Sequence, residues 1–148
     1  MPHTITPASW QLHQADLMQI RTEVFVQEQQ ISAADEWDGL DDGAIHFLAR
    51  SATGAPIGCA RLLVEISGEQ RLYHIGRVAI IEPFRNQGIG HQLMVVVIAH
   101  CKKIATANSI YLHAQTKRRH FYEMLGFVAQ GNQFMDAGIP HISMYLAQ

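Results

Sequence analysis

The chain has 148 residues, 48% of them hydrophobic, and a formal net charge of −2 at pH 7 with its histidines neutral. That length suits one domain with a single substantial core, and the hydrophobic content is too high for a disordered chain. A charge this close to zero gives no electrostatic reason to expect nucleic acid as a partner. We therefore predict one domain over residues 1–148.

Cysteine usage and apolar patterning bear on location. Cys59 and Cys101 lie in separate apolar runs, with no Cys-x-x-Cys pair. The N-terminus has no basic stretch followed by an apolar core, and no apolar run approaches the length of a membrane span. A reduced, cytoplasmic location is the simplest interpretation, with neither secretion nor membrane insertion expected. The histidines show no His-Glu-x-x-His spacing, so we predict no metal site.

The first third of the chain predicts a strand, a helix and a loop. A short strand is expected near Thr4 to Thr6. The helix that follows has apolar residues from Leu17 to Phe25 on one side, with Ser9 or Pro7 near its start. The acidic, irregular stretch from Gln29 to Gly43 is interpreted as a surface loop.

An antiparallel meander is expected next. Strands are predicted at His46–Arg50, Ile57–Ile66 and Leu72–Ile81, separated by turn-forming residues at 52–56 and 67–70. The second half of the chain predicts a long helix to about Ala107, then further short elements. These are a strand at Ile110, a helix around Tyr122, and strands at Phe127-Val128 and Ile142–Leu146. The fold class that follows is mixed α+β with a largely antiparallel first half.

A glycine-containing turn joins the third meander strand to the long helix. The turn, Arg85-Asn86-Gln87-Gly88-Ile89-Gly90, follows the apolar run 75–81 and precedes the helix that begins near His91. The first N–H groups of a helix lack internal partners and carry partial positive charge, so a phosphate or pyrophosphate fits there. Gly88 and Gly90 let the backbone approach an anion, and Arg85 adds a forked cationic donor. Neither the Walker loop nor the dinucleotide fingerprint fits these residues.

Two motifs carry a resemblance to a known family. The Arg-x-x-Gly-x-Gly turn resembles the acyl-CoA pyrophosphate loop of the GNAT superfamily of N-acetyltransferases. Phe121-Tyr122-Glu123-Met124-Leu125-Gly126-Phe127 resembles the Phe-Tyr-x-x-x-Gly-Phe signature of the same superfamily. Residues 21–29, the acidic loop, His46, the run 112–115 and the tail 138–142 are similar to the ElaA-type branch. As a plain structural alternative, Phe121, Met124 and Leu125 form one apolar face of a short helix that Gly126 ends.

The resemblance implies a splayed, mostly antiparallel sheet flanked by helices, and acetyl-CoA or CoA as co-substrate. It also implies that the backbone of Val78, Ala79 and Ile80 hydrogen-bonds the pantetheine arm like an added strand. The cofactor residues it indicates are Val78, Ala79, Ile80, Arg85, Asn86, Gln87, Gly88, Ile89, Gly90, His91 and Gln115. Superfamily members often carry Asn and Ala seven and four positions before the tyrosine, where this chain has Gln115 and Arg118.

Tyr122 is the predicted catalytic residue. The resemblance places the family's tyrosine here, and a phenol with an ordinary pKa of about 10 keeps its proton at pH 7 for a departing thiolate. A helix tyrosine that only packs is the alternative. For the general base that frees the amine, the residues leave five candidates open: Glu23, Glu28, Glu65, His74 and His141.

The acceptor pocket is expected across the central strand from the cofactor. Phe25, Glu28, His74 and His141 are predicted to bound it. The acidic cluster from Asp35 to Asp42 either attracts a cationic amine or is solvated loop charge. The basic run 117–120 either meets the 3′-phosphate of CoA or is a solvated face.

Together these observations predict a cytoplasmic, acetyl-CoA-dependent N-acetyltransferase. Its acceptor is expected to be a primary amine of a small molecule or peptide, attacking directly in a ternary complex. A covalent intermediate on Cys59 or Cys101 is disfavoured, because neither lies beside a histidine motif. The competing class is a non-catalytic acyl-CoA sensor or partner module. We expect no nucleic acid or membrane partner, and a homodimer is left open.

Overall fold

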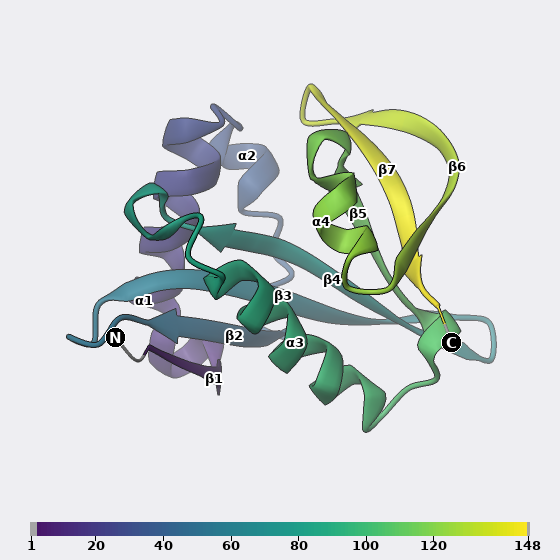
Figure 1. Ribbon diagram of the computed structural model, residues 1–148, viewed down its shortest axis with the longest axis horizontal. Coiled ribbons are helices and arrows are strands. Elements are labelled where there is room, and N and C mark those ends of the chain that lie inside the picture. The colour runs from purple at the N-terminus through teal and green to yellow at the C-terminus, as the bar shows by residue number, and fades with distance from the viewer. Residues whose placement is uncertain (1–2, 148) are drawn as a thin grey trace.

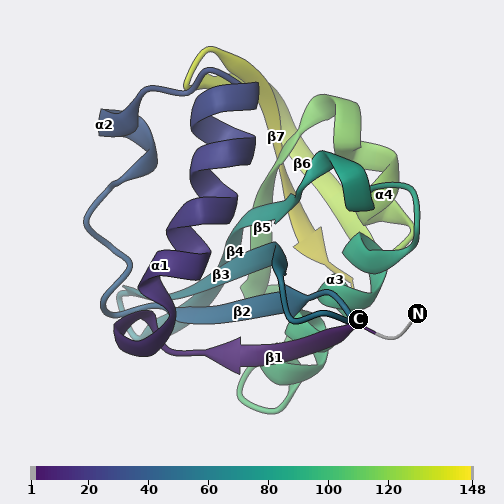
Figure 2. The same ribbon diagram turned by 90° about the vertical axis from the view of Figure 1, so that its left-hand side faces the viewer.

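The computed structural model describes residues 3–147, so Met1, Pro2 and Gln148 of the predicted domain lie outside the described range. One seven-stranded sheet runs in the order β1-β2-β3-β4-β5-β7-β6, with helices on both faces (Figures 1 and 2). The strands are β1 Thr4–Ala8, β2 Ile45–Arg50, β3 Pro56–Ser67, β4 Gln70–Ile80, β5 Ile110–Gln115, β6 Phe127–Asp136 and β7 Ile139–Leu146. The α-helices are α1 Trp10–Arg21, α2 Ala33–Glu36, α3 Ile89–Lys102 and α4 Arg119–Glu123. A π-helical segment, η1 Thr22–Glu28, continues α1. Short 3-10 turns lie at Glu82–Phe84, Ala107–Ser109 and Thr116–Arg118.

Neighbouring strands are antiparallel except for β4 and β5, which run parallel. The predicted mixed α+β class with a mostly antiparallel sheet is therefore confirmed. Helices α3 and α4 cover one face, and α1 with α2 lies on the other (Figure 2).

Strands β4 and β5 separate soon after they meet. They pair only from Tyr73 to Ile75, opposite Ile110 to Leu112, and Figure 1 shows them diverging beyond that point. The far half of β4 keeps its partner β3 on one side, while its edge toward β5 is free. A bulge marks where the free edge begins: the β3–β4 register shifts there and Arg77 has a φ of +51°. This left-handed conformation is uncommon for a residue with a side chain.

Strand alternation sorts the side chains into two apolar layers. Ile75, Leu112 and Met144 point toward α3, where Leu93 and Val97 complete the larger core cluster. On the opposite face, Leu17, Ile20 and Phe25 pack on Cys59 and Ala79 in a second cluster. Ser9 caps the N-terminus of α1 by accepting a hydrogen bond from the Leu12 N–H. Of the two predicted starts, Ser9 is therefore the cap.

Three expected boundaries are wrong. The stretch 29–43 is not an irregular surface loop: it contains α2, whose cap Ser32 accepts from the Asp35 N–H. Helix α3 ends at Lys102 rather than near Ala107. Strand β6 continues from Phe127 to Asp136, since β7 starts earlier than expected and the two form a long hairpin.

Two carboxylates of the acidic segment 29–43 are buried and paired with an arginine of α1. Arg21 is only 1% exposed and donates from Nε to Glu36 at 2.8 Å and from Nη1 to Asp41 at 2.6 Å. Its guanidinium also lies over the rings of Trp10 and Trp37. Glu36 and Asp41 are themselves buried. Buried charges persist only when paired, so both expectations for these two carboxylates, solvated loop charge and attraction of an amine, give way to a structural role.

The same network holds the bulge of β4. Arg77 donates from Nε to Glu36 at 3.0 Å and from Nη2 to Asp38 at 3.2 Å, and Arg61 donates to Asp38 at 2.9 Å. Burial alone would raise the pKa of Asp38, but hydrogen bonds from Arg61 and the Leu40 N–H, with the charges of Arg61 and Arg77, lower it to about 2. The acidic segment thus fixes the point at which β4 leaves β5.

Candidate active site

The turn between β4 and α3 presents a row of unpaired donors. Within residues 3–147, the six backbone N–H groups from Asn86 to His91 have no hydrogen-bond partner. The first bond of α3 runs from the Gln92 N–H to the Gly88 carbonyl at 3.1 Å. Asn86 and Gly88 take φ values of +62° and +81°, which turn the chain into the helix. Unpaired N–H groups at the start of a 14-residue helix form an anion site.

Gly88 and Gly90 leave room in different ways. An added Cβ at Gly88 would have nothing within 4 Å, so only the positive φ opposes a side chain there. An added Cβ at Gly90 would meet the Phe121 ring at 3.6 Å and Ile80 at 3.8 Å. The first turn of α3 therefore lies beside α4, which brings the two sequence motifs together in space.

Arg85 is held by a carboxylate from η1. Its two terminal nitrogens donate to Glu28 at 2.6 and 2.7 Å, and its Nε donates to the Ile80 carbonyl at 2.8 Å. The hydrogen bonds from Arg85 are the main cause that lowers the pKa of Glu28. Glu28 thus lies at the predicted phosphate loop, and the sequence had indicated the acceptor side instead.

Gln29, the residue after Glu28, contacts β5, the strand on the other side of the gap. The Gln115 side-chain amide, at the end of β5, donates to Gln29 Oε1 at 2.8 Å. Glu28 bonds Arg85, in the turn that follows β4, and Gln29 bonds Gln115, at the end of β5, so the end of η1 bridges the opening between the two strands. The backbone of Val78, Ala79 and Ile80 lies on the free edge of β4 below this crossing. Such an edge offers N–H and C=O groups to an extended ligand.

Tyr122 lies on the buried side of α4. It is 9% exposed, and its ring makes edge contacts with Phe121 and Phe127. Its hydroxyl makes no hydrogen bond within the described part of the chain. Burial raises the pKa of Tyr122 to about 12. The phenol is therefore protonated at neutral pH, as a proton donor must be.

Both cysteines are poor nucleophiles. Cys59 is 1% exposed and Cys101 is fully buried. Burial raises the pKa of the Cys59 thiol to about 12 and that of Cys101 to about 11. The thiolate is the reactive form, so neither side chain is suited to carry an acyl group.

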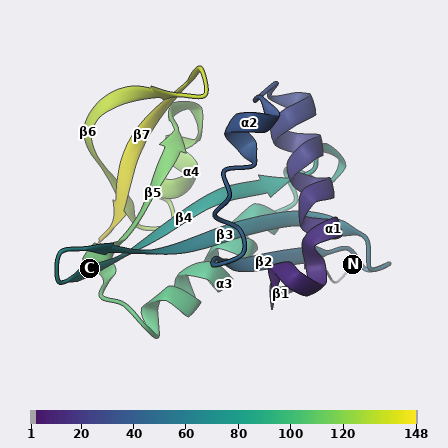
Figure 3. The ribbon, with the colours of Figure 1, turned by 180° about the vertical axis from the view of Figure 1, so that it is seen from behind.

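The sheet face opposite α3 and α4 is open where β4, β5 and β7 meet. Figure 3 shows this stretch between α1–α2 on one side and the β6–β7 hairpin on the other. His74 on β4 stacks on Tyr111 of β5 at 4.4 Å, and Tyr111 stacks on Tyr145 of β7 at 5.5 Å. His113 packs edge-on against His74 at 4.8 Å. Glu65 on β3 contacts both His74 and Tyr111.

Two further predicted acceptor residues differ in exposure. Phe25 is 7% exposed and packs in the second core cluster, which leaves little of its ring for a substrate. His141 is half-buried near the start of β7, opposite Gln115, with its Nδ1 2.7 Å from the Ile139 carbonyl oxygen. Its ring stacks on Phe134 at 6.0 Å between centroids. Of the four predicted residues, His74 and His141 face the open part of the sheet.

Sequence reasoning missed Gln29, Arg77 and Tyr111. No residue near Arg77 in the sequence indicates its positive φ, because the bulge has no glycine or other typical turn residue at that position. Tyr111 alternates with the buried Ile110 and Leu112, so strand alternation predicts that its side chain points away from the core. Its bond to Glu65 could not be predicted, because the two residues are 46 positions apart.

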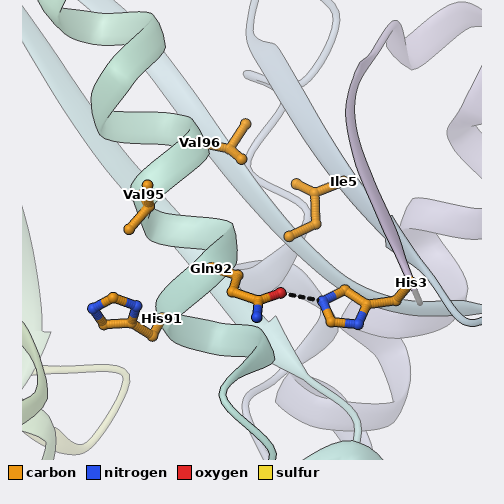
Figure 4. A pocket seen from close by; sticks show the side chains of 6 residues that line it. All are labelled: His3, Ile5, His91, Gln92, Val95 and Val96. Carbon is orange, nitrogen blue, oxygen red and sulfur yellow. Dashed lines mark hydrogen bonds between the residues drawn. The ribbon is translucent and has the colours of Figure 1, made fainter. Parts of the chain in front are cut away.

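A hollow of about 480 Å³ beside the turn between β4 and α3 was also not expected. Figure 4 shows His3 and Ile5 facing Gln92 and Val96 of α3, with His91 and Val95 further round the helix.

The fold and the comparisons with known proteins identify an acyltransferase. Residues 13–147 match the family model described as "Acetyltransferase (GNAT) domain", and the chain belongs to this family. The GNAT fold family binds acetyl-CoA or CoA, and the predicted resemblance to GNAT enzymes is confirmed.

Similar proteins span most of the chain. The Bacillus subtilis protein YyaT is 34% identical over 136 residues, which cover 90% of this chain and 86% of YyaT. An acyl-CoA N-acyltransferase from Pseudomonas aeruginosa superposes with a TM-score of 0.86 at 33% identity, covering 99% of this chain and 100% of that one. Escherichia coli ElaA gives 0.85 at 27% identity, with 99% and 100% covered.

Residues 3–147 contain neither a membrane-spanning helix nor a cluster of metal-ligating side chains. No helix there is both long and apolar enough to cross a membrane. No group of three or more His, Cys, Asp or Glu residues within that range is arranged to hold a metal ion.

Proposed function

We propose that the protein moves an acetyl group from acetyl-CoA to a primary amine of a small molecule or peptide. The amine attacks the thioester directly in a ternary complex. The observation that carries this proposal is the row of six unpaired N–H groups from Asn86 to His91, preceded along the chain by the free edge of β4. Pyrophosphate at the row and pantetheine along the edge would use both sets of donors.

The thioester is expected beside the free edge after the bulge at Arg77. An N–H of Val78, Ala79 or Ile80 that points away from β3 polarises the thioester carbonyl and stabilises the charge on its oxygen during attack. Gln115 lies across the gap and supplies an amide to the pantetheine arm once it exchanges its bond to Gln29. Arg85 has its guanidinium on Glu28, so its contact with phosphate requires a partner exchange as well.

Tyr122 is the proposed general acid. Collapse of the tetrahedral intermediate forms the amide and releases CoA as a thiolate, which takes the phenolic proton. A direct mechanism is supported by the cysteines, since both thiols are buried and have raised pKa values. The acceptor amine approaches from the open face, past His74 and His141, opposite the helices α3 and α4.

The test is a thiol-release assay with acetyl-CoA and a panel of amines that includes spermidine, tyramine, lysine and a short peptide. We expect turnover that depends on at least one amine and yields an N-acetyl product by mass spectrometry. Calorimetric binding of CoA without turnover on the whole panel would favour the acyl-CoA sensor instead.

A further inference from the structure

A group of aromatic rings lies on the open face of the sheet. The rings come from four strands that neighbour one another in the order β4, β5, β7 and β6. We call this group the aromatic bed, and it consists of His74, Tyr111, His113, Phe134, His141 and Tyr145. All of these side chains are half-buried or exposed, so the bed borders the space above the sheet. Accessible rings that lie side by side are typical of a site for an organic ligand.

The rings of the bed cover one another's faces. Tyr111 stacks on His74 at 4.4 Å and on Tyr145 at 5.5 Å, with interplanar angles of 17° and 21°. His74 and Tyr145 belong to strands on opposite sides of β5, so both faces of the Tyr111 ring are occupied. The part of this ring that is left for a ligand is its edge, where the ring hydrogens carry partial positive charge.

An edge of this kind favours the face of another aromatic ring. Within the bed, His113 and Phe134 already meet edge-to-face, with centroids 5.1 Å apart and planes at 80°. A ligand ring gains this contact in addition to the burial of its area, whereas a saturated chain gains the burial alone. A cation gains less from the centre of the bed, because cation–π attraction needs a free ring face.

The carboxylates near the bed offer little attraction to a second positive charge of an acceptor. Both oxygens of Glu65 are used, since Oε2 lies 3.0 Å from His74 Nδ1 and Oε1 accepts a hydrogen bond from the Tyr111 hydroxyl. Glu28 is bonded by an arginine of the turn before α3. Asp136 of β6 is exposed, and exposed ion pairs contribute little. These carboxylates therefore give no strong partner to the further ammonium groups of a polyamine.

The bed ends where the free edge of β4 begins. Strand β4 pairs with β5 as far as Ile75, and Gly76 follows. Gly76 is two positions after His74 and therefore lies on the same face of the strand. A Cβ added to Gly76 would have nothing within 4 Å, so open space leads from the bed to the free edge, about 7 Å along the strand. A ring and a primary amine joined by an ethyl linker span a distance of this order.

We propose that the acceptor is a primary arylalkylamine, an aromatic ring carried on an ethylamine chain, whose ring lies on the aromatic bed. Tyr145 and Phe134 are specificity-determining residues, and the open space at Gly76 lets the amine reach the thioester beside Val78. This inference rests on the proposed function and names its substrate class. Small arylethylamines carry this group, and so does the N-terminal phenylalanine of a peptide.

The experiment measures kcat/KM at saturating acetyl-CoA for phenethylamine, cyclohexylethylamine and spermidine. The cyclohexyl ring is the more hydrophobic of the two rings, so burial of area alone would favour it, whereas edge-to-face contact favours the phenyl ring. We expect phenethylamine to exceed cyclohexylethylamine by about 2- to 10-fold, the range for one aromatic pair, and to exceed spermidine by more. Peptides that begin with phenylalanine or with leucine form a second arm. The arm with the higher kcat/KM identifies the source of the amine, and the ring preference is judged in that arm.

Two variants test whether the bed causes the preference. Tyr145→Leu and Phe134→Leu each remove one ring and keep an apolar side chain, so the preference for the aromatic substrate should fall toward one. Calorimetry should show unchanged CoA affinity in both. Val128→Ala is the matched control, because Val128 is 51% exposed, pairs with Tyr145 across β6 and β7, and has no ring. It should keep the wild-type preference.

Several outcomes overturn the inference. A wild-type enzyme that acetylates cyclohexylethylamine, spermidine or the leucine peptide at least as well as the aromatic substrate of the same arm does so and leaves the proposed function standing. A phenyl preference that survives in both leucine variants has the same consequence. An enzyme that releases no thiol with any of these amines or peptides removes the proposed function and the inference with it. If one leucine variant does not unfold cooperatively in urea, the wild-type preference and the other variant decide.

Discussion

The gap between β4 and β5 is lined differently on its two sides. Toward α3, the candidate site consists of backbone N–H groups from one short stretch, Asn86 to His91. On the opposite face it consists of side chains from separate strands, with Glu65, His74 and Tyr111 as the bonded unit. A site built from the backbone needs a local turn and two glycines, which a motif records. A site built from side chains depends on strand register, which a single sequence does not display.

The largest effect that would test this comparison belongs to Tyr122, which lies near the backbone site but acts through its side chain. Tyr122→Phe keeps the ring contacts with Phe121 and Phe127 and removes the acid, so kcat should fall by about 10²–10⁴-fold while CoA affinity is retained. Steady-state kinetics and calorimetry measure the two quantities. Tyr73→Phe is the matched control: it loses a hydroxyl bond to the Ile104 carbonyl and should lose stability without losing kcat. An unchanged kcat in Tyr122→Phe, with chemistry rate-limiting, would move the acid role elsewhere.

A second prediction concerns the acidic segment. Asp41→Ala leaves Arg21 and Arg61 buried with fewer partners, and breaking a buried ion pair costs about 3–5 kcal/mol of unfolding free energy. Urea unfolding monitored by tryptophan fluorescence gives the value. Asp42→Ala, an exposed neighbour, is the control and should change stability by less than about 0.5 kcal/mol. Equal stability of the two variants would return Asp41 to the role of a solvated loop charge.

A substitution at Gly88 tests whether the unpaired backbone N–H groups bind CoA. Gly88→Val places a side chain in the open space beside the unpaired N–H groups, and loss of one to two charge-assisted hydrogen bonds should weaken CoA binding by about 10- to 100-fold. Gly68→Val is the matched control, because Gly68 also has a positive φ and open space around it but lies in the β3–β4 turn. Both variants should lose similar stability from backbone strain. Undiminished CoA affinity in a folded Gly88→Val protein would contradict the placement.

The smallest predicted effect is the change in CoA affinity of a Glu28 variant, which tests whether Glu28 belongs to the cofactor side or the acceptor side of the gap. The sequence indicated an acceptor residue, whereas the structure bonds this carboxylate to Arg85. Glu28→Gln removes a negative charge near the pyrophosphate and frees Arg85, so CoA affinity should rise by up to about fivefold, the scale of an exposed ion pair. Titration calorimetry with CoA measures it. A higher acceptor KM with unaltered CoA affinity would instead restore the original interpretation.

The sequence predicted the elements that local patterns define. The order of the seven strands, helices α1, α3 and α4, a helix start at Ser9 or Pro7 and the glycine turn before α3 followed from alternation, capping residues and glycines, whereas α2 was missed. The buried charges did not, because the partners of Arg21 lie 15 and 20 residues away and their loop looked solvent-exposed. The bulge at Arg77 and the crossing of Gln29 to Gln115 depend on tertiary contacts as well.

The central claim is that CoA pyrophosphate binds the unpaired backbone N–H groups between β4 and α3. Amide chemical shifts measured by NMR during a CoA titration test it most directly, since each N–H of residues 86–91 reports separately. The account predicts that these six amides show the largest shifts, with smaller ones along Val78 to Ile80, and that Gly88→Val needs about 10- to 100-fold more CoA for the same shifts. Shifts that spare residues 86–91 and gather at the hollow between His3 and Val95 would contradict it.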